Sequence, residues 1–230
     1  MEEKIKMMEK NKVKAVIFDL DGTLADTLGT IKNAMDKTFS KFSLPERSLE
    51  DIRQAIGCGA RMLIAKLMPP ECAASDEYVD RVLEYYDARY RETFLDCGDC
   101  YDGVKETVLW LSDKGIKLAV LSNKQDYQTK ALVNSLFPEG VFLSVRGQTD
   151  LPKKPDPTVP LMIADELSVN PSECAYVGDS EVDRLTAENA GMIPLVVGWG
   201  YRTRDELAEN GIDNVIADAN ALRARLIELI

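Results

Sequence analysis

Apolar runs recur along the chain between clusters of turn residues, and each run is short enough to form one buried strand. Most are apolar at nearly every position, which is typical of strands covered on both faces. Between them, apolar residues recur every three or four positions, as in amphipathic helices. This alternation predicts an α/β fold built on a Rossmann-like, doubly wound parallel sheet. The predicted strands are 13–18, 116–121, 141–145, 174–177, 193–197 and 214–216.

Residues 28–94 interrupt the alternation, because they contain at least three helical patterns and no convincing strand. We expect an inserted helical bundle there, packed on a core formed by 12–27 and 95–230, with a charged extension at 1–11. The last helix of the insertion is predicted to begin after Ser75 as its N-cap. Its buried stripe is predicted to consist of Val79, Val82, Leu83, Tyr86 and Tyr90.

Composition excludes several kinds of chemistry. None of the 230 residues is histidine, which rules out Ser-His-Asp triads and histidine-ligated zinc. Acidic residues outnumber basic ones by 39 to 28, so the net charge of -11 would repel nucleic acid and anionic membranes. The start lacks a signal-like apolar stretch, and no uncharged apolar run is long enough to span a bilayer. We therefore expect a cytoplasmic monomer or homodimer that binds neither nucleic acid nor membrane.

The five cysteines are expected to be reduced thiols, because an odd number in a chain of this length does not resemble a secreted disulfide scaffold. Cys97 and Cys100 have CxxC spacing. They follow a helical pattern rather than a strand, and no second pair accompanies them, so a structural role is favoured over redox or metal chemistry.

Acidic residues gather where two of the predicted strands end. Asp19 and Asp21 follow the first strand and, being two apart in extended chain, are expected to point the same way. Asp179 and Asp183 follow the fourth strand and are expected to share a helix face, although helix capping would also explain them. Ligands of open α/β sheets bind at the carboxyl ends of the strands. Crowded carboxylates at that edge favour a hard cation such as Mg²⁺.

This arrangement suits phosphoryl transfer. Asp19 could accept a phosphoryl group as an acyl phosphate, and Asp21 could protonate the leaving alcohol and later activate water. The hydroxyl of Ser122 could bind phosphate oxygens. Lys154 could hold nucleophile and phosphate together, although a lysine before proline is by itself unremarkable.

The segments DLDGTLADT, LSNK, KKPDP and GDSEVD resemble, in that order, the four motifs of the haloacid dehalogenase superfamily. The resemblance implies a helical cap inserted in a Rossmann-like core and an aspartyl-phosphate mechanism that depends on Mg²⁺. It also implies the site residues. Catalysis is assigned to Asp19, Asp21 and Lys154, phosphate binding to Thr23, Ser122 and Asn123, and the metal to Asp19, Asp21 through its carbonyl, Asp179 and Asp183.

Within the superfamily the chain is most similar to phosphoglycolate phosphatases, which implies a small phosphorylated metabolite, 2-phosphoglycolate first, as the substrate. The turn containing Gly57, Gly59 and Arg61 could present Arg61 or backbone amides to a substrate carboxylate, or simply open a helix. A pyrophosphatase or a β-phosphoglucomutase-like transferase on the same fold is an alternative. A receiver-like signalling module that keeps a phosphorylated aspartate is a further one, disfavoured by the inserted helices.

Overall fold

The computed structural model describes residues 13–96 and 99–230, so the predicted extension at 1–11 and Cys97 lie outside the described residues. Its centre is a six-stranded sheet with all neighbours parallel, in the order β3-β2-β1-β4-β5-β6. The predicted α/β fold with a parallel sheet is confirmed. The strands are β1 (Ala15–Phe18), β2 (Lys117–Gln125), β3 (Ser144–Gln148), β4 (Cys174–Gly178), β5 (Ile193–Val197) and β6 (Val215–Ile216).

Both faces of the sheet are covered, which explains why the central strands are apolar throughout. Val16 and Phe18 point to one face and Ala15 and Ile17 to the other, as the alternation of a strand requires. The first face packs against α7 (Val104–Asp113), α8 (Asp126–Leu136) and α12 (Ala219–Leu229). The second packs against α9 (Thr158–Glu166) and α10 (Glu181–Asn189). Shorter elements connect them: η1 (Phe94–Asp96), η2 (Pro171–Glu173) and α11 (Arg204–Glu209).

The predicted strand boundaries hold within two residues for β1, β4, β5 and β6 and fail for β2 and β3. β5 matches its prediction at both ends, whereas β3 begins three residues later than the apolar run at 141–145 suggests. β3 is an edge strand, so its exposed side tolerates polar residues, and Leu143 before it is 61% exposed. β2 extends to Gln125, beyond the predicted end at 121, with an irregular register against β3 after Leu121.

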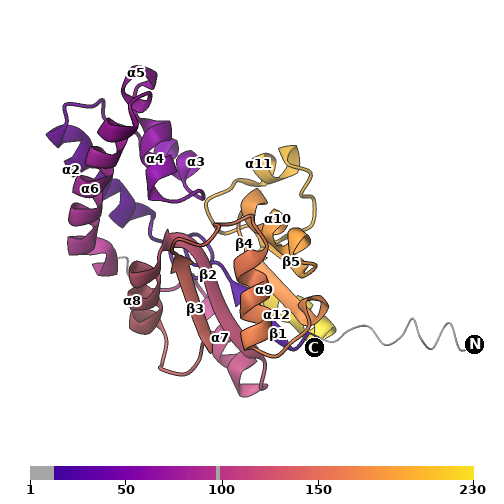
Figure 1. Cartoon of the computed structure of the whole chain (residues 1–230). Coiled ribbons are helices and arrows are strands. Elements are labelled where there is room, and N and C mark those ends of the chain that lie inside the picture. The colour runs from indigo at the N-terminus through magenta and orange to yellow at the C-terminus, as the bar shows by residue number, and fades with distance from the viewer. Residues whose placement is uncertain (1–12, 97–98) are drawn as a thin grey trace, which may run out of the picture.

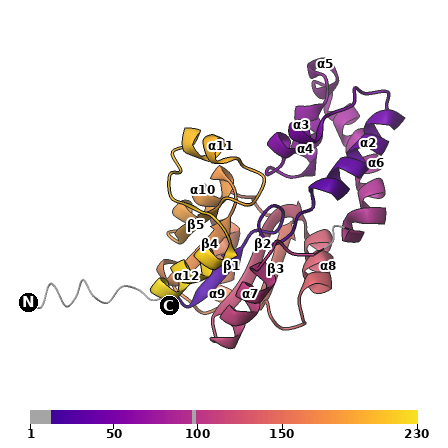
Figure 2. The ribbon, with the colours of Figure 1, turned by 180° about the vertical axis from the view of Figure 1, so that it is seen from behind.

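Between β1 and α7 the described residues form helices and no named strand, and the five α-helices of this stretch, which we call the cap helices, gather at one end of the molecule (Figures 1 and 2). The predicted N-cap Ser75 is confirmed, since its hydroxyl accepts a hydrogen bond from Tyr78 N. Four of the five predicted stripe residues are buried, and Leu83 is half-buried. The cap helices are α2 (Leu28–Lys41), α3 (Leu49–Ala55), α4 (Ala60–Leu67), α5 (Pro70–Ala73) and α6 (Asp76–Thr93).

None of the described helices combines the length and the apolar composition that crossing a bilayer requires.

Candidate active site

Three acidic side chains meet at the carboxyl ends of the two central strands. Asp19 follows β1 and Asp179 follows β4, and the strands are joined there by a hydrogen bond from Asp19 N to Val177 O (2.9 Å). Asp183 reaches the same point from the first turn of α10. All three are buried, and each places a carboxylate oxygen within 4.8 Å of the other two. We call Asp19, Asp179 and Asp183 the acid cluster.

Asp179 is fixed by backbone that returns to it from β5. Its Oδ2 accepts a hydrogen bond from Tyr201 N (2.6 Å). The residue before Tyr201 must be glycine, because a Cβ on Gly200 would lie 2.2 Å from Gly22 O and 2.3 Å from the Asp179 Cβ. Burial, reinforced by the nearby charge of Asp183, raises the pKa of Asp179 to about 7. Asp179 precedes α10, whose N-cap is Ser180, so it does not share a helix face with Asp183 as we expected.

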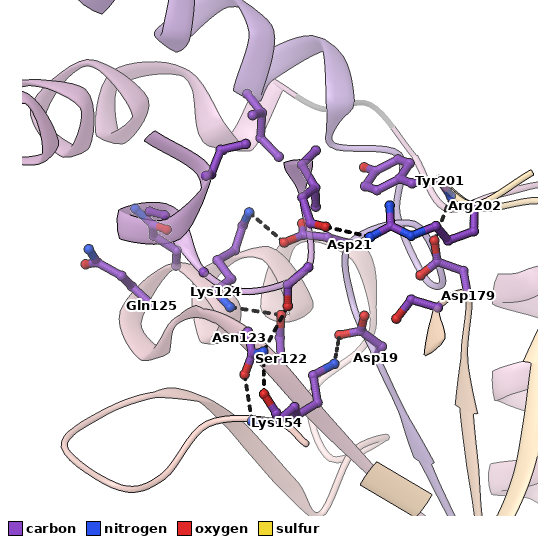
Figure 3. Close-up of a pocket in the computed structure, with 18 of the residues that line it drawn as sticks. Asp19, Asp21, Ser122, Asn123, Lys124, Gln125, Lys154, Asp179, Tyr201 and Arg202 are labelled. Atoms are coloured by element: carbon purple, nitrogen blue, oxygen red, sulfur yellow. Dashed lines mark hydrogen bonds and ion pairs between the residues drawn. The ribbon is translucent and has the colours of Figure 1, made fainter. Parts of the chain in front are cut away.

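Lys154 brings a positive charge into the acid cluster. Its Nζ lies 2.8 Å from Asp19 Oδ1 (Figure 3). It also lies 2.7 Å from Asp183 Oδ1, and the side chain is 3% exposed. Burial opposes the charge of Lys154, but the carboxylates of Asp183 and Asp19 raise its pKa well above the usual range. Burial also raises the pKa of Asp19 strongly, against the attraction of Lys154. One lysine therefore faces three acids and leaves their charge only partly compensated.

The acid cluster has the chemistry of a Mg²⁺ site. Carboxylate oxygens are the ligands that this ion prefers, and a divalent cation would balance the charge that Lys154 leaves. Asp19 Oδ1 is buried and makes no hydrogen bond among the described residues, because Lys154 Nζ is close but not aligned with it. Asp183 is less free, since Oδ1 contacts Lys154 and Oδ2 accepts from the Ser180 hydroxyl (2.5 Å). Asp179 also accepts two hydrogen bonds, but it makes no ion pair with a described residue, so Asp19 and Asp179 are the better candidate ligands.

Asp21 lies in the same pocket but faces a different cation. Its Oδ2 is 2.9 Å from Lys124 Nζ (Figure 3), and its Oδ1 accepts a hydrogen bond from the Thr27 hydroxyl (2.6 Å). Lys124 is 9% exposed and also lies over the ring of Tyr90, 4.8 Å from its centroid. Asp19 and Asp21, which were expected to point the same way, therefore contact different lysines, Lys154 and Lys124.

Lys124 was absent from the residues predicted for the site, although the strand pattern could have found it. Ser122 and Lys124 are two apart in β2 and both line the pocket. The carboxylate of Asp21 raises the pKa of Lys124 despite its burial, which keeps the ammonium charged.

The three residues predicted to bind phosphate differ in position. Ser122 lines the pocket. Asn123 lines it too, but its amide is committed to backbone, donating to Gly57 O (2.9 Å) and Lys154 O (3.2 Å) and accepting from Lys154 N (3.0 Å). Thr23 is fully buried outside the pocket lining, and its hydroxyl donates to Asp179 Oδ1 (3.3 Å). The structure therefore gives Asn123 and Thr23 supporting positions, and only Ser122 is left for phosphate.

The turn between α3 and α4 closes one side of the pocket. Gly57 and Gly59 line it, whereas Arg61 does not. The guanidinium of Arg61 instead pairs with Asp76 (2.5 Å) and Asp80 (2.8 Å) on the exposed surface of α6. Of the residues predicted in the cap, only the two glycines are therefore brought to the site.

Arg202 is a second pocket residue that was not among the predicted site residues. It joins the sheet end to the cap helices, with Nε 3.0 Å from Glu181 Oε2 and hydrogen bonds to Arg53 O (3.2 Å) and Ile56 O (3.0 Å). Neighbouring Tyr201 is buried, and its hydroxyl accepts from Thr27 N (2.8 Å). The segment after β5 therefore shapes both the acid cluster and the pocket.

A doubly wound sheet whose carboxyl edge gathers carboxylates, a hydroxyl and two lysines defines an α/β enzyme that works without histidine. The chain belongs to the haloacid dehalogenase-like hydrolase family, whose model matches residues 16–197. It is 30% identical over 210 residues to phosphoglycolate phosphatase 1 of Pseudomonas aeruginosa, covering 88% of this chain and 77% of that protein.

Solved structures share the whole architecture. A predicted phosphoglycolate phosphatase from Haemophilus somnus matches with a TM-score of 0.83 at 26% identity, over 93% of this chain and 98% of the other. A β-phosphoglucomutase from Clostridium difficile matches with a TM-score of 0.76 at 21% identity, over 94% and 96% of the two chains, which shows a common fold alone. The expected family resemblance is thus confirmed.

Proposed function

We propose that this hydrolase is a Mg²⁺-dependent phosphatase that cleaves a small phosphomonoester through an aspartyl-phosphate on Asp19. The observation that carries the proposal is the surrounding of Asp19. It is buried at a strand end, 2.8 Å from Lys154 and within reach of Asp179, in a pocket that also contains Ser122. A nucleophilic carboxylate beside a cation and a hydroxyl donor suits a phosphoryl group, whose oxygens need such partners.

In the first half-reaction a carboxylate oxygen of Asp19 bonds to phosphorus while the bond to the alcohol oxygen breaks. Lys154 keeps the nucleophile in place and offsets the charge of the incoming phosphoryl group. Ser122 donates its hydroxyl to a phosphoryl oxygen. Bound Mg²⁺, held by Asp19 and Asp179, would neutralise further charge on those oxygens. The leaving alkoxide takes its proton from Asp21.

In the second half-reaction water attacks phosphorus, its proton goes to Asp21, and the carboxylate of Asp19 is released with inorganic phosphate. The contact with Lys124 (2.9 Å) holds the carboxylate of Asp21 at the pocket, where it can accept this proton. To donate in the first half-reaction, protonated Asp21 has to turn from Lys124 toward the leaving oxygen. We propose that movement of the cap helices, residues 28–94, over a core of 12–27 and 95–230 accompanies this turn.

The names of the relatives make 2-phosphoglycolate the first substrate to assay, and the cytoplasm stays the predicted location. Transfer to a sugar phosphate remains the alternative, since a mutase shares the fold and fold does not decide function. Incubation with β-glucose 1-phosphate separates the two, because a mutase yields glucose 6-phosphate and a phosphatase yields free phosphate.

The test is phosphate release from p-nitrophenyl phosphate and 2-phosphoglycolate, with Mg²⁺ or with excess EDTA. We expect turnover only with the metal, and a loss of about 10⁴-fold or more in Asp19→Asn. Asp165→Asn is the matched control, because Asp165 is an exposed acid on α9, away from the pocket. Undiminished turnover in EDTA, or by Asp19→Asn, would contradict the proposed function.

A further inference from the structure

The part of the pocket that faces the cap helices is apolar. Ile31 of α2, Leu63 of α4 and Tyr86 of α6 line it, each at most 5% exposed, together with the half-buried Ile56. These four side chains come from separate cap segments and meet above the acid cluster. We call Ile31, Ile56, Leu63 and Tyr86 the apolar wall. Since the phosphoryl group must reach Asp19, the rest of the substrate is the part that contacts the apolar wall.

The cations that line this pocket are already paired. Lys154 contacts Asp19 and Asp183, and Lys124 contacts Asp21 and the face of Tyr90. Arg202 is bound by Glu181 and by the carbonyls of Arg53 and Ile56. With Lys154 serving the phosphoryl group, a second anionic group of the substrate would compete with Asp21 for Lys124 or with Glu181 for Arg202.

The other polar groups near the apolar wall are neutral. Gln125 and Gln128 line the pocket, and their amide nitrogens donate to Asp87 (2.6 Å) and to the Tyr127 hydroxyl (2.9 Å). The first turn of α4, next to Gly59, adds backbone N–H groups that lack partners within the helix. Such groups bind a hydroxyl or carbonyl oxygen, and a carboxylate placed there would still lie between the apolar wall and the acids of the pocket.

We propose, on the basis of the phosphatase function above, that the substrate is a phosphomonoester whose alcohol is uncharged and carries an apolar portion that packs on the apolar wall. This restricts the substrate class and disfavours esters with a second anionic group, such as the carboxylate of 2-phosphoglycolate. Specificity then comes from burial of carbon against Ile31, Leu63 and Tyr86, and from the cost of an unpaired carboxylate at the same place.

The test compares two esters of equal size. Isobutyl phosphate replaces the carboxylate of 2-phosphoglycolate by an isopropyl group with the same number of non-hydrogen atoms. We expect the kcat/KM of the parent chain for isobutyl phosphate to exceed that for 2-phosphoglycolate by about tenfold or more. Leu63→Lys should lower this ratio by about tenfold or more, because it places a free ammonium in the wall.

Two further variants serve as a second test of the apolar wall and as a control. Ile56→Lys puts the same charge at a half-buried wall position, in case Leu63→Lys does not fold. Met62→Lys is the control, because Met62 neighbours Leu63 on α4 but is 38% exposed and outside the pocket lining, so the ratio should stay at the parent value. A parent ratio of one or less, or a ratio unchanged by both wall variants, would overturn the inference. Failure to hydrolyse any ester, p-nitrophenyl phosphate included, would refute the proposed function together with it.

Discussion

Replacing Asp179 by asparagine removes one negative charge from the acid cluster and keeps the size of the side chain. The new amide oxygen can still accept the hydrogen bond from Tyr201 N, which is 2.6 Å from Oδ2 in the parent chain. The hydroxyl of Thr23 can rotate to accept from the new amide nitrogen. The close backbone of Gly22 and Gly200 is undisturbed, since asparagine adds no atom. The substitution therefore isolates the effect of the charge.

The magnitude follows from the pKa of Asp179. Burial raises the pKa from an ordinary value of 3.8 to about 7, so the unfolded chain loses this proton at lower pH than the folded chain does. Folding stability therefore falls as pH rises from about 4 to 7 and then levels off. The cost is about 2 kcal/mol at pH 5 and about 4 kcal/mol at pH 8. Asp179→Asn escapes it, so its advantage over the parent should grow by about 2 kcal/mol between these pH values.

The assay is urea unfolding of the metal-free protein at pH 5 and pH 8, repeated with Mg²⁺. We expect Asp179→Asn to be the more stable chain without metal, chiefly at pH 8, and to gain less than the parent when Mg²⁺ is added. The variant should also be a poorer phosphatase. Asp165→Asn, an exposed control on α9, should follow the parent at both pH values. If the stability difference between parent and Asp179→Asn is the same at pH 5 and pH 8, the reasoning about the acid cluster is wrong.

Four other substitutions or conditions test the remaining contacts. Lys154→Met should unfold about 3–5 kcal/mol more easily in urea without metal, since it leaves buried carboxylates without their cation, and it should be inactive. Lys124→Met should lower kcat on p-nitrophenyl phosphate by about tenfold or more, because Asp21 loses the contact that orients it. Arg61→Ala should keep kcat/KM within about twofold, because Arg61 pairs with the exposed Asp76 and Asp80 outside the pocket. With a net charge of -11 the chain does not steer anions to the pocket, so kcat/KM should change by less than about threefold between 50 and 300 mM salt; a steep fall would show attraction.

Most of the sheet could be predicted because burial on both faces leaves a clear apolar record. β1, β4 and β5 are such strands, and their boundaries fall within two residues of the predictions. In the edge strand β3 the apolar pattern is weaker. β3 reads Ser-Val-Arg-Gly-Gln, and the apolar run at 141–143 precedes it, because Val141 and Phe142 pack on the core without belonging to a strand. Periodicity reports burial, and burial is not confined to strands.

The site could be predicted where a residue follows directly from a strand end. Asp19, Ser122 and Asp179 lie in or beside the pocket for that reason. Side-chain direction could not be predicted, because it depends on partners distant in sequence. Asp21 is close to Asp19 along the chain, yet its carboxylate turns to Lys124, 103 residues away. Arg61 has the right charge for a substrate carboxylate, but its guanidinium pairs with Asp76 and Asp80 of α6 instead.

Three segments of the core contain pairs of adjacent residues. One residue of each pair belongs to the site, and the next donates a hydrogen bond to the turn between α3 and α4. Beside Ser122, Asn123 donates to Gly57 O; beside Lys154, Lys153 donates to Cys58 O (2.8 Å). Beside Tyr201, whose backbone binds Asp179, Arg202 donates to Ile56 O.

Three core segments thus grip three consecutive carbonyls, 56 to 58, of the turn between α3 and α4. Adjacent residues of an extended segment point in opposite directions, so a segment that aims one side chain at the acid cluster offers the next to what lies above it. This geometry explains the position of Asn123 by its hydrogen bond to Gly57 O, without a contact to phosphate. It also couples the position of the turn between α3 and α4 to the residues that form the site. A displacement of that turn should therefore shift Ser122, Lys154 or Tyr201 as well.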